Sequence, residues 1–255
     1  MLAAPCFVLS DVHLGPAPAE AERSLLDLLA LARTEAKSVV LNGDVFDFWF
    51  EWQHVMPRTG FRVLAALATL VEAGVDVLWI AGNHDCWGGE ILTKDVGVTY
   101  HVGPWRGEIA GWNTLIEHGD GLREAEDAPY RRLRSLLRNR LAIRAFGWLH
   151  PDYATSIALR SSHTSRNMRP RDGGEGLKKV ALARLHAEPA LALYVFGHSH
   201  AQTAGRTPNG AVYANPGAWM DAPTFLRVTP GRVELARLDG PEITVLQTLE
   251  RSTLS

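Results

Sequence analysis

The 255-residue sequence has only two cysteines, no long apolar run and almost no net charge. Two thiols, Cys6 and Cys86, are too few for the disulfide framework of a small secreted protein, so we expect a reducing compartment. No apolar stretch approaches the roughly 20 residues of a membrane-spanning helix, and no signal peptide is recognisable before the first apolar run. We therefore expect a cytoplasmic protein. The net charge of −2 gives the chain as a whole no bias towards nucleic acid or anionic membranes.

The charge is nevertheless unevenly distributed along the chain. Residues 121–190 contain fourteen Arg or Lys and seven Asp or Glu, a local balance of +7 that leaves −9 for the remainder. This asymmetry indicates an anionic substrate or surface near the middle segment. From the length we expect a single domain over residues 1–255, with a helical insert at about 122–190.

Five short apolar runs are each followed by Asp, Asn or His. The clearest run is 38–41, which leads into Gly43-Asp44-Val45-Phe46-Asp47. In an open α/β sheet, ligands bind in the crevice beyond the carboxyl ends of the strands. Convergence of five such ends predicts a metal site with room for more than one ion. The other four runs are 7–10, 77–81, 113–117 and 193–196, followed by Asp11 and His13, by Asn83-His84-Asp85, by His118-Gly119-Asp120, and by His198 and His200.

Helical patterns at 19–36 and 58–73 alternate with these runs, which favours a largely parallel sheet with covering helices. Residues 98–117 read as short strands of a second sheet, and further strands are expected at 202–206, 211–214, 224–229 and 232–238. Residues 122–190 are mainly helical. We expect this insert to cap the crevice by packing an apolar stripe on the parent domain, with lipid contact as an addition. The stripe consists of Leu133, Leu137, Leu141, Ala145 and Trp148.

The residue types at the strand ends suit divalent ions such as Mn, Fe or Zn, which accept mixed oxygen and imidazole ligands. Asp11 and His13 are two residues apart and can be aimed at one ion, while His198 and His200 could serve the same ion or one each. Two ions about 3.5–4 Å apart can clamp a phosphoryl group and hold an attacking hydroxide. Asp44 could bridge the two ions. A carbonyl oxygen and a further imidazole come from Asn83 and His118.

Several neighbouring residues suggest supporting roles. His84 would donate a proton to the leaving group or hold a phosphate oxygen. Asp47 and Asp85 would orient the ligating imidazoles. The aromatic run at 46–52, which includes Trp49, is either a packed loop or a wall of the cleft. Cys86 is either a small packed residue or an oxidation-sensitive thiol.

These motifs resemble those of the calcineurin-like metallophosphoesterases. They stand here as Asp11-Val12-His13, Gly43-Asp44-Val45-Phe46-Asp47, Gly82-Asn83-His84-Asp85, His118-Gly119-Asp120 and Gly197-His198-Ser199-His200. The resemblance implies a four-layer α/β/β/α sandwich of two mixed sheets with a dinuclear centre, manganese being expected before iron or zinc. It implies one ion held by Asp11, His13, Asp44 and His200, and the other by Asp44, Asn83, His118 and His198.

Within that superfamily the chain is most similar to UDP-2,3-diacylglucosamine hydrolases of lipid A synthesis. The similar segments are Asp44 to Trp49, Asp127 to Arg132 and Arg160 to Asn167. Such enzymes cleave the pyrophosphate of a UDP-linked diacylated sugar to UMP and the lipid sugar phosphate, which implies peripheral contact with the inner membrane face. Well-known members have Arg where this chain has His84. The implied substrate contacts are His84, Trp49, Asp127, Tyr130, His163, Arg166 and Asn167.

Three alternatives stay open with different weights. A phosphodiesterase or nuclease acting on nucleotides or nucleic acid shares the first and third motifs, but this chain has no coiled-coil arm. Ser/Thr protein phosphatases usually continue the second motif with Arg-Gly, whereas Phe48 and Trp49 follow Asp47 here. A non-catalytic binding scaffold usually loses ligand residues, and every ligand position is filled here.

Overall fold

Two mixed β-sheets form the centre of the computed structural model, which describes residues 1–123, 127–167 and 172–251, with backbone only at 129, 132, 133, 136 and 161–167. The strands of the first sheet, in spatial order, are β12 (Glu242–Glu250), β11 (Arg232–Asp239), β10 (Thr224–Val228), β1 (Cys6–Leu9), β2 (Ser38–Asn42), β3 (Asp76–Ile80) and β4 (Thr99–His101). Strands β1 to β4 run parallel, and β10 pairs antiparallel with β1.

The second sheet has a parallel centre and antiparallel edges. Its strands in spatial order are β5 (Trp105–Ile109), β6 (Trp112–Ile116), β7 (Leu193–Val195), β9 (Val212–Asn215) and β8 (Thr203–Arg206). Strands β6, β7 and β9 run parallel, while β5 pairs antiparallel with β6 and β8 pairs antiparallel with β9. The mixed character of both sheets confirms the expected fold class.

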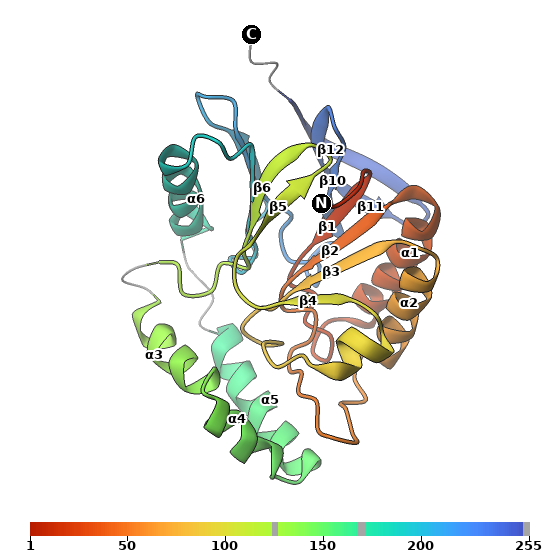
Figure 1. Cartoon of the computed structure of the whole chain (residues 1–255), viewed down its shortest axis with the longest axis vertical. Coiled ribbons are helices and arrows are strands. Elements are labelled where there is room, and N and C mark those ends of the chain that lie inside the picture. The colour runs from red at the N-terminus through yellow and green to blue at the C-terminus, as the bar shows by residue number, and fades with distance from the viewer. Residues whose placement is uncertain (124–126, 168–171, 252–255) are drawn as a thin grey trace.

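Helices cover the outer faces of both sheets (Figure 1). Helices α1 (Ala19–Glu35) and α2 (Phe61–Glu72) bury Leu25, Leu28 and Leu67 in a core shared with the first sheet. Helix α6 (Glu175–Ala187) buries Leu177 and Leu185 against the second sheet. A further apolar cluster fills the space between the sheets. The layers are therefore α/β/β/α, and α6 belongs to the outer layer, so the cap is narrower than the expected range 122–190.

Three helices form the cap at one end of the molecule: α3 (Ala128–Leu137), α4 (Arg140–Gly147) and α5 (Pro151–Asn167) (Figure 1). The cap packs on the parent domain through Phe146 and Ala154, which contact the aromatic rings of Phe48, Phe50 and Trp52. The aromatic run at 46–52 thus serves largely as packing surface.

The apolar stripe expected from Leu133 to Trp148 is wrong for its second half. Leu141 and Trp148 are 74% and 91% exposed. The stripe assumed one continuous helix, but α3 ends at Leu137 and the Asn139 side chain accepts hydrogen bonds from the backbone N–H groups of Leu141 and Ala142. This N-cap starts a new helix with a different rotation about its axis, so another face meets the core.

Two further elements differ from expectation. Strand β4, expected in the second sheet, pairs with β3 and extends the first. Strand β12 was not predicted, because its apolar alternation is interrupted at Val245-Leu246 and most of its side chains are exposed. Among the described residues, no helix is long and apolar enough to cross a membrane.

Candidate metal centre

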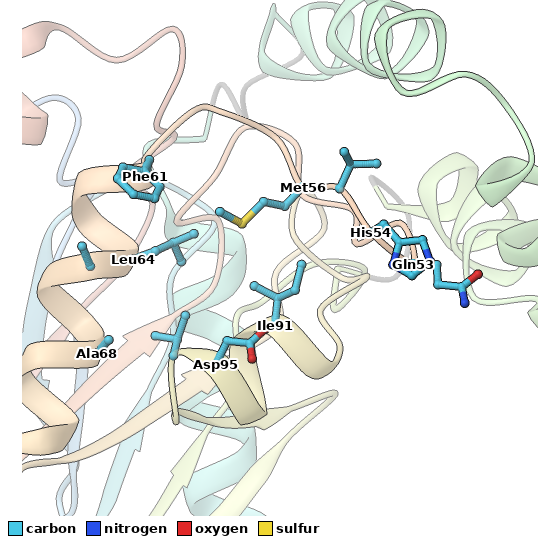
Figure 2. Close-up of a pocket in the computed structure, with 11 residues that line it drawn as sticks. Gln53, His54, Met56, Phe61, Leu64, Ala68, Ile91 and Asp95 are labelled. Atoms are coloured by element: carbon cyan, nitrogen blue, oxygen red, sulfur yellow. The ribbon is translucent and has the colours of Figure 1, made fainter.

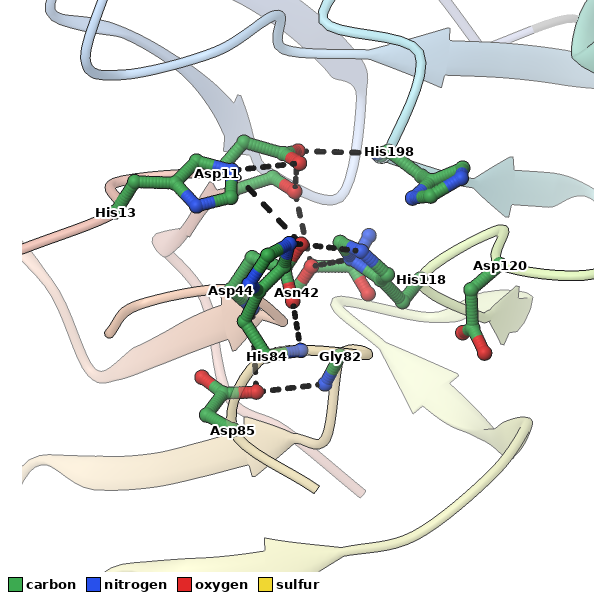
Figure 3. A network of polar contacts seen from close by, with 12 residues as sticks. Asp11, His13, Asn42, Asp44, Gly82, His84, Asp85, His118, Asp120 and His198 are labelled. Carbon is green, nitrogen blue, oxygen red and sulfur yellow. Dashed lines mark hydrogen bonds and ion pairs between the residues drawn. The ribbon is translucent and has the colours of Figure 1, made fainter. Parts of the chain in front are cut away.

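The candidate ligands lie where five strands end, at adjacent edges of the two sheets. Asp11 and His13 follow β1, and Asp44 follows β2, its parallel neighbour. His118 and His198 follow β6 and β7, which are parallel neighbours in the second sheet. Figure 3 shows Asp44 between Asp11 and His13 on one side and His118 on the other. The predicted convergence of the strand ends is therefore present.

The backbone at these positions is strained. Six described non-glycine residues have a positive φ between 51° and 61°, a region that L-residues rarely adopt. Only Ala110 is not a candidate ligand; the other five are Asp11, His13, Asp44, His198 and His200. Such strain persists only where surrounding structure enforces it, and it gathers at functional sites.

Gly82 has no side chain, which lets the second and third motifs approach each other. A Cβ atom at Gly82 would collide with the carboxylate Oδ1 of Asp44. The same oxygen accepts a hydrogen bond from the His84 backbone N–H at 2.9 Å. Gly82 is thus required by close approach, and its position fixes one oxygen of Asp44 so that Oδ2 faces the cluster.

The first group of metal-ligating atoms comes from Asp11, His13 and His200, whose candidate atoms lie within 4.8 Å of one another. Nε2 of His200 lies 3.4 Å from Oδ1 of Asp11 and 3.4 Å from Nε2 of His13. Asp11 and His13 are 0% and 1% exposed. This group therefore offers two imidazole nitrogens and one buried carboxylate oxygen close together, a set of ligands that suits a divalent cation.

The second group comes from Asp44, His118 and His198, again within 4.8 Å. Nδ1 of His118 donates a hydrogen bond to the Asn42 carbonyl oxygen at 2.9 Å, which leaves Nε2 as the ligand atom, 3.1 Å from Oδ2 of Asp44. Oδ2 of Asp44 also lies 3.8 Å from Nε2 of His13, a ligand of the first group. Asp44 therefore stands between the two groups.

Asn83 offers an unusual atom for this site. Its Oδ1 is buried and has no hydrogen-bond partner among the described residues. A buried carbonyl oxygen without a partner costs free energy, and a bound cation would remove that cost. The donor set of carboxylates, imidazoles and one amide oxygen therefore fits divalent metal ions.

The pKa shifts show that the carboxylates and imidazoles of the cluster act strongly on one another. Burial alone would raise the pKa of Asp44, but His118 and His84 hold it well below its usual value. Burial would lower the pKa of His118, yet the Asp44 carboxylate raises it well above its usual value. Burial and the neighbouring His118 lower the pKa of His198 to about 4, so its imidazole is neutral and ready to ligate at neutral pH.

His84 faces the same centre from the third motif. Its Nδ1 donates to the Asp47 carbonyl oxygen at 3.0 Å, so Nε2 points towards Asp44, 4.0 Å from Oδ2. His13, Asp44 and His84 form a third group of candidate ligand atoms. The position suits either contact with a substrate oxygen or ligation.

Of the two aspartates expected to orient imidazoles, only Asp47 lies in position to do so. Oδ1 of Asp47 is 3.5 Å from Nδ1 of His13. The expectation for Asp85 is wrong: its carboxylate accepts hydrogen bonds from the backbone N–H groups of Asp44, Val45 and Gly82 and from the indole of Trp79. Asp85 therefore holds the turn that carries Asp44.

Cys86 follows Asp85 and is partly buried. Burial and the Asp85 charge raise the pKa of its thiol to about 12. The thiolate is scarce at neutral pH, which favours a packed residue over a redox-sensitive one.

The predicted substrate contacts divide into three cases. Trp49 is fully buried in the core and stacks on Phe46, so the prediction that it lines the cleft is wrong. Asp127 accepts hydrogen bonds from the guanidinium and backbone N–H of Arg123, so it stabilises the turn before α3 instead of facing a ligand. The hydroxyl of Tyr130 donates to Asp120 at 2.8 Å, which places this ring beside the centre. The side chains of His163, Arg166 and Asn167 lie outside the described residues.

Some residues that position the site carry no motif signal. Asn215 donates hydrogen bonds to the Gly197 carbonyl and the Ser199 hydroxyl and accepts one from the Gly217 N–H, which fixes the turn carrying His198. The residues Asn215-Pro216-Gly217 are typical of a turn, and nothing in the sequence shows these hydrogen bonds. A buried asparagine followed by Pro-Gly was the one available signal.

A separate apolar pocket of about 440 Å³ lies between α2, residues 53–56 and the π-helical turn η1 (Ile91–Asp95). Figure 2 shows Met56, Phe61 and Leu64 lining it. None of its lining residues is a candidate ligand, so we do not place the chemistry there.

A calcineurin-like phosphoesterase family model matches residues 4–202. A UDP-2,3-diacylglucosamine hydrolase of Porphyromonas gingivalis is 31% identical over 215 residues, covering 76% of this chain and 82% of the relative. Those of Nitrosococcus oceani and Neisseria meningitidis serogroup B are 26% and 28% identical, each over 200 residues; they cover 76% and 77% of this chain and 78% and 82% of the relatives.

Solved structures support the fold. A single mutant of Vps29 from Entamoeba histolytica superposes with a TM-score of 0.51 at 13% identity, covering 97% of this chain and 99% of that one. Vps29 of Chaetomium thermophilum gives 0.51 at 10% identity, covering 98% and 96%. Fold and site together define a metal-dependent phosphoesterase. The chain belongs to the calcineurin-like phosphoesterase family.

Proposed function

We propose that the protein hydrolyses the pyrophosphate bond of a nucleotide-linked acylated sugar, UDP-2,3-diacylglucosamine, to UMP and the lipid sugar phosphate. The observation that carries the hydrolytic part is the Asp44 carboxylate, shared between two groups of candidate metal ligands. The substrate rests on the relatives of that name, at 26–31% identity. We also propose that the chain is one phosphoesterase domain with the cap helices as an insert.

In this proposal Asp11, His13 and His200 hold one ion, and Asn83, His118 and His198 hold the other, with Asp44 as the bridge. Two divalent ions bound there would polarise the phosphoryl oxygens and lower the pKa of the attacking water. The Asn42 carbonyl accepts a hydrogen bond from Nδ1 of His118 and so fixes that imidazole before the substrate arrives. The Asp47 carboxylate lies 3.5 Å from Nδ1 of His13 and attracts that ring electrostatically.

His84 is the proposed proton donor. Nδ1–H of His84 donates a hydrogen bond to the Asp47 carbonyl. In the protonated ring, Nε2–H is therefore the group that faces the centre, with Nε2 4.0 Å from Oδ2 of Asp44. From there it can hold a phosphate oxygen or protonate the leaving oxygen.

The cap supports an amphiphilic substrate. Its outer surface exposes Trp148 (91%), Leu141 (74%) and Tyr153 (66%), with Ile157 and Leu159 on α5. Exposed apolar groups at this density, on a segment with a basic balance, are typical of surfaces that contact lipid. We propose that the enzyme is cytoplasmic, that its cap contacts the inner face of the membrane, and that the cap admits the acyl chains of the substrate.

Hydrolysis by manganese-loaded protein tests the proposal. We expect turnover of bis(4-nitrophenyl) phosphate, which needs only the metal centre, and a higher kcat/KM for the diacylated UDP-sugar than for UDP-glucose. No turnover of any of the three would contradict the hydrolytic function. Equal kcat/KM for UDP-glucose and the diacylated compound would remove the lipid substrate while leaving the phosphoesterase intact.

A further inference from the structure

Three polar side chains of the cap are spaced four residues apart. Tyr130 and Arg134 lie on α3, and Arg138 lies in the turn that follows it, where its backbone N–H donates to the Arg134 carbonyl at 3.0 Å. The spacing puts the three on one face of this segment. All three converge on Asp120. The Asp120 side chain follows His118 by two residues and is seen beyond His118 and His198 in Figure 3.

At Asp120, two positively charged arginines lie near one negatively charged carboxylate. Tyr130 donates the close hydrogen bond, at 2.8 Å to Oδ2. Nε of Arg134 and a terminal nitrogen of Arg138 lie 3.7 and 4.0 Å from the same oxygen, outside hydrogen-bonding distance. Two guanidinium groups thus face one carboxylate that is already hydrogen-bonded.

A second ion pair in the same segment, Arg123 with Asp127, is a hydrogen-bonded pair and serves for comparison. The Arg123 guanidinium donates to Asp127 at 2.6 Å, and its side chain is 10% exposed. The Arg134 and Arg138 side chains are 27% and 29% exposed. Within the described residues, the Arg138 guanidinium makes no hydrogen bond, and that of Arg134 makes one, to the Asp120 carbonyl at 3.1 Å. Most of their donors therefore stay available.

The two arginines are also held in place. The Trp87 indole donates to the Leu137 carbonyl at 2.7 Å, which fixes the end of α3 to the loop that follows His84. Arg138 is close enough to the partly buried Cys86 for its charge to act on that thiol. Gly121 gives room for the Arg134 side chain, whose terminal nitrogen would lie 3.2 Å from a Cβ there. Arginines on a fixed helix end lose little entropy on binding an anion.

We propose that Arg134 and Arg138 form a binding site for the second phosphate of a diphosphate substrate, the one not held by the metal centre. This inference rests on the proposed function, because it needs a reacting phosphate at Asp44. Asp120 and Tyr130 position the two guanidinium groups, and the fork geometry of arginine matches phosphate oxygens. The pair selects diphosphates over single phosphodiesters.

Calorimetric titration of the manganese-loaded protein with UDP-glucose tests the site directly. Arg138→Gln should weaken binding by about 10- to 100-fold, the loss of one or two charge-assisted hydrogen bonds. Arg134→Gln should act in the same direction, and Arg138→Lys should retain part of the affinity. Arg140→Gln removes the same charge from an exposed position two residues away and should bind as the parent does.

Hydrolysis of bis(4-nitrophenyl) phosphate separates this site from the metal centre. We expect Arg138→Gln to lose at least tenfold more kcat/KM on the diacylated UDP-sugar than on this single phosphodiester, whereas Arg140→Gln keeps the parent values on both. Unchanged UDP-glucose affinity in both Gln variants, or equal losses on both compounds, would overturn the proposal, as would a parent protein that does not bind UDP-glucose. Failure of the proposed function is distinct, because then the parent itself would not cleave the aryl diester.

Discussion

Asp44 owes its position to three separate restraints. Its backbone is left-handed, with φ 55°. Gly82 provides the space for one carboxylate oxygen, and the buried Asp85 accepts the Asp44 backbone N–H at 3.2 Å. Burial and the Asp44 charge raise the pKa of Asp85 to about 6. Keeping Asp85 buried therefore costs free energy, and its hydrogen bonds fix the turn that carries Asp44.

Replacing Asp44 should therefore affect both metal positions together. We expect Asp44→Ala protein dialysed against manganese to retain no ion, whereas the parent retains two, measured by elemental analysis. Asp76→Ala, at an exposed position at the start of β3, is the control and should retain two. A variant lacking the Asp44 carboxylate that still held two ions would show that it is not the bridge.

At the residue scale, the sequence predicts chemical type better than orientation. The motif residues Asp11, His118 and His198 were recognisable because strand ends concentrate polar groups. The roles of Asp85 and Trp49 were predicted wrongly, because spacing does not show which way a side chain turns after a strand. Asn215 was missed for the same reason, since its hydrogen bonds cross from β9 to the turn after β7.

At the scale of elements, the cap shows how one capping residue redirects a helical face. The Asn139 N-cap separates α3 from α4, so Phe146 packs on the aromatic cluster while Trp148, two residues later, is exposed. Most strands and the outer helices α1 and α2 were predictable because each has its own apolar period. β12 and the sheet of β4 were not, because pairing partners are long-range and leave no local period.

These two positions at α4 make a matched pair for stability. Phe146→Ala should lower the free energy of unfolding by about 2–3 kcal/mol, below the ~3–5 kcal/mol of a fully buried Phe because the ring is half-buried. Trp148→Ala should change it by less than about 0.5 kcal/mol, since its ring is 91% exposed. Urea unfolding measures both, and equal losses would show that the packed and exposed faces of α4 are assigned wrongly.

For the whole molecule, the metal centre lies where the two sheets meet. Asp11 and Asp44 come from the first sheet and His118 and His198 from the second, so bound ions would join the carboxyl ends of β1, β2, β6 and β7. The described contacts between those strand ends include pairs of imidazoles: Nε2 of His13 and Nε2 of His200 lie 3.4 Å apart. Metal binding should therefore stabilise the association of the sheets as well as the site.

Manganese should consequently raise the melting temperature of the whole chain in one transition. Each ion at about 100 times its Kd contributes ~2.7 kcal/mol, and a chain of this size gains about 2–4 °C per kcal/mol, which gives a rise of about 5–10 °C for each ion bound. Calorimetry should show the rise reversed by EDTA and absent in Asp44→Ala. Because the ligands come from both sheets, a metal that raised the melting temperature of parent and variant equally would have to bind elsewhere, and the centre would no longer account for the coupling.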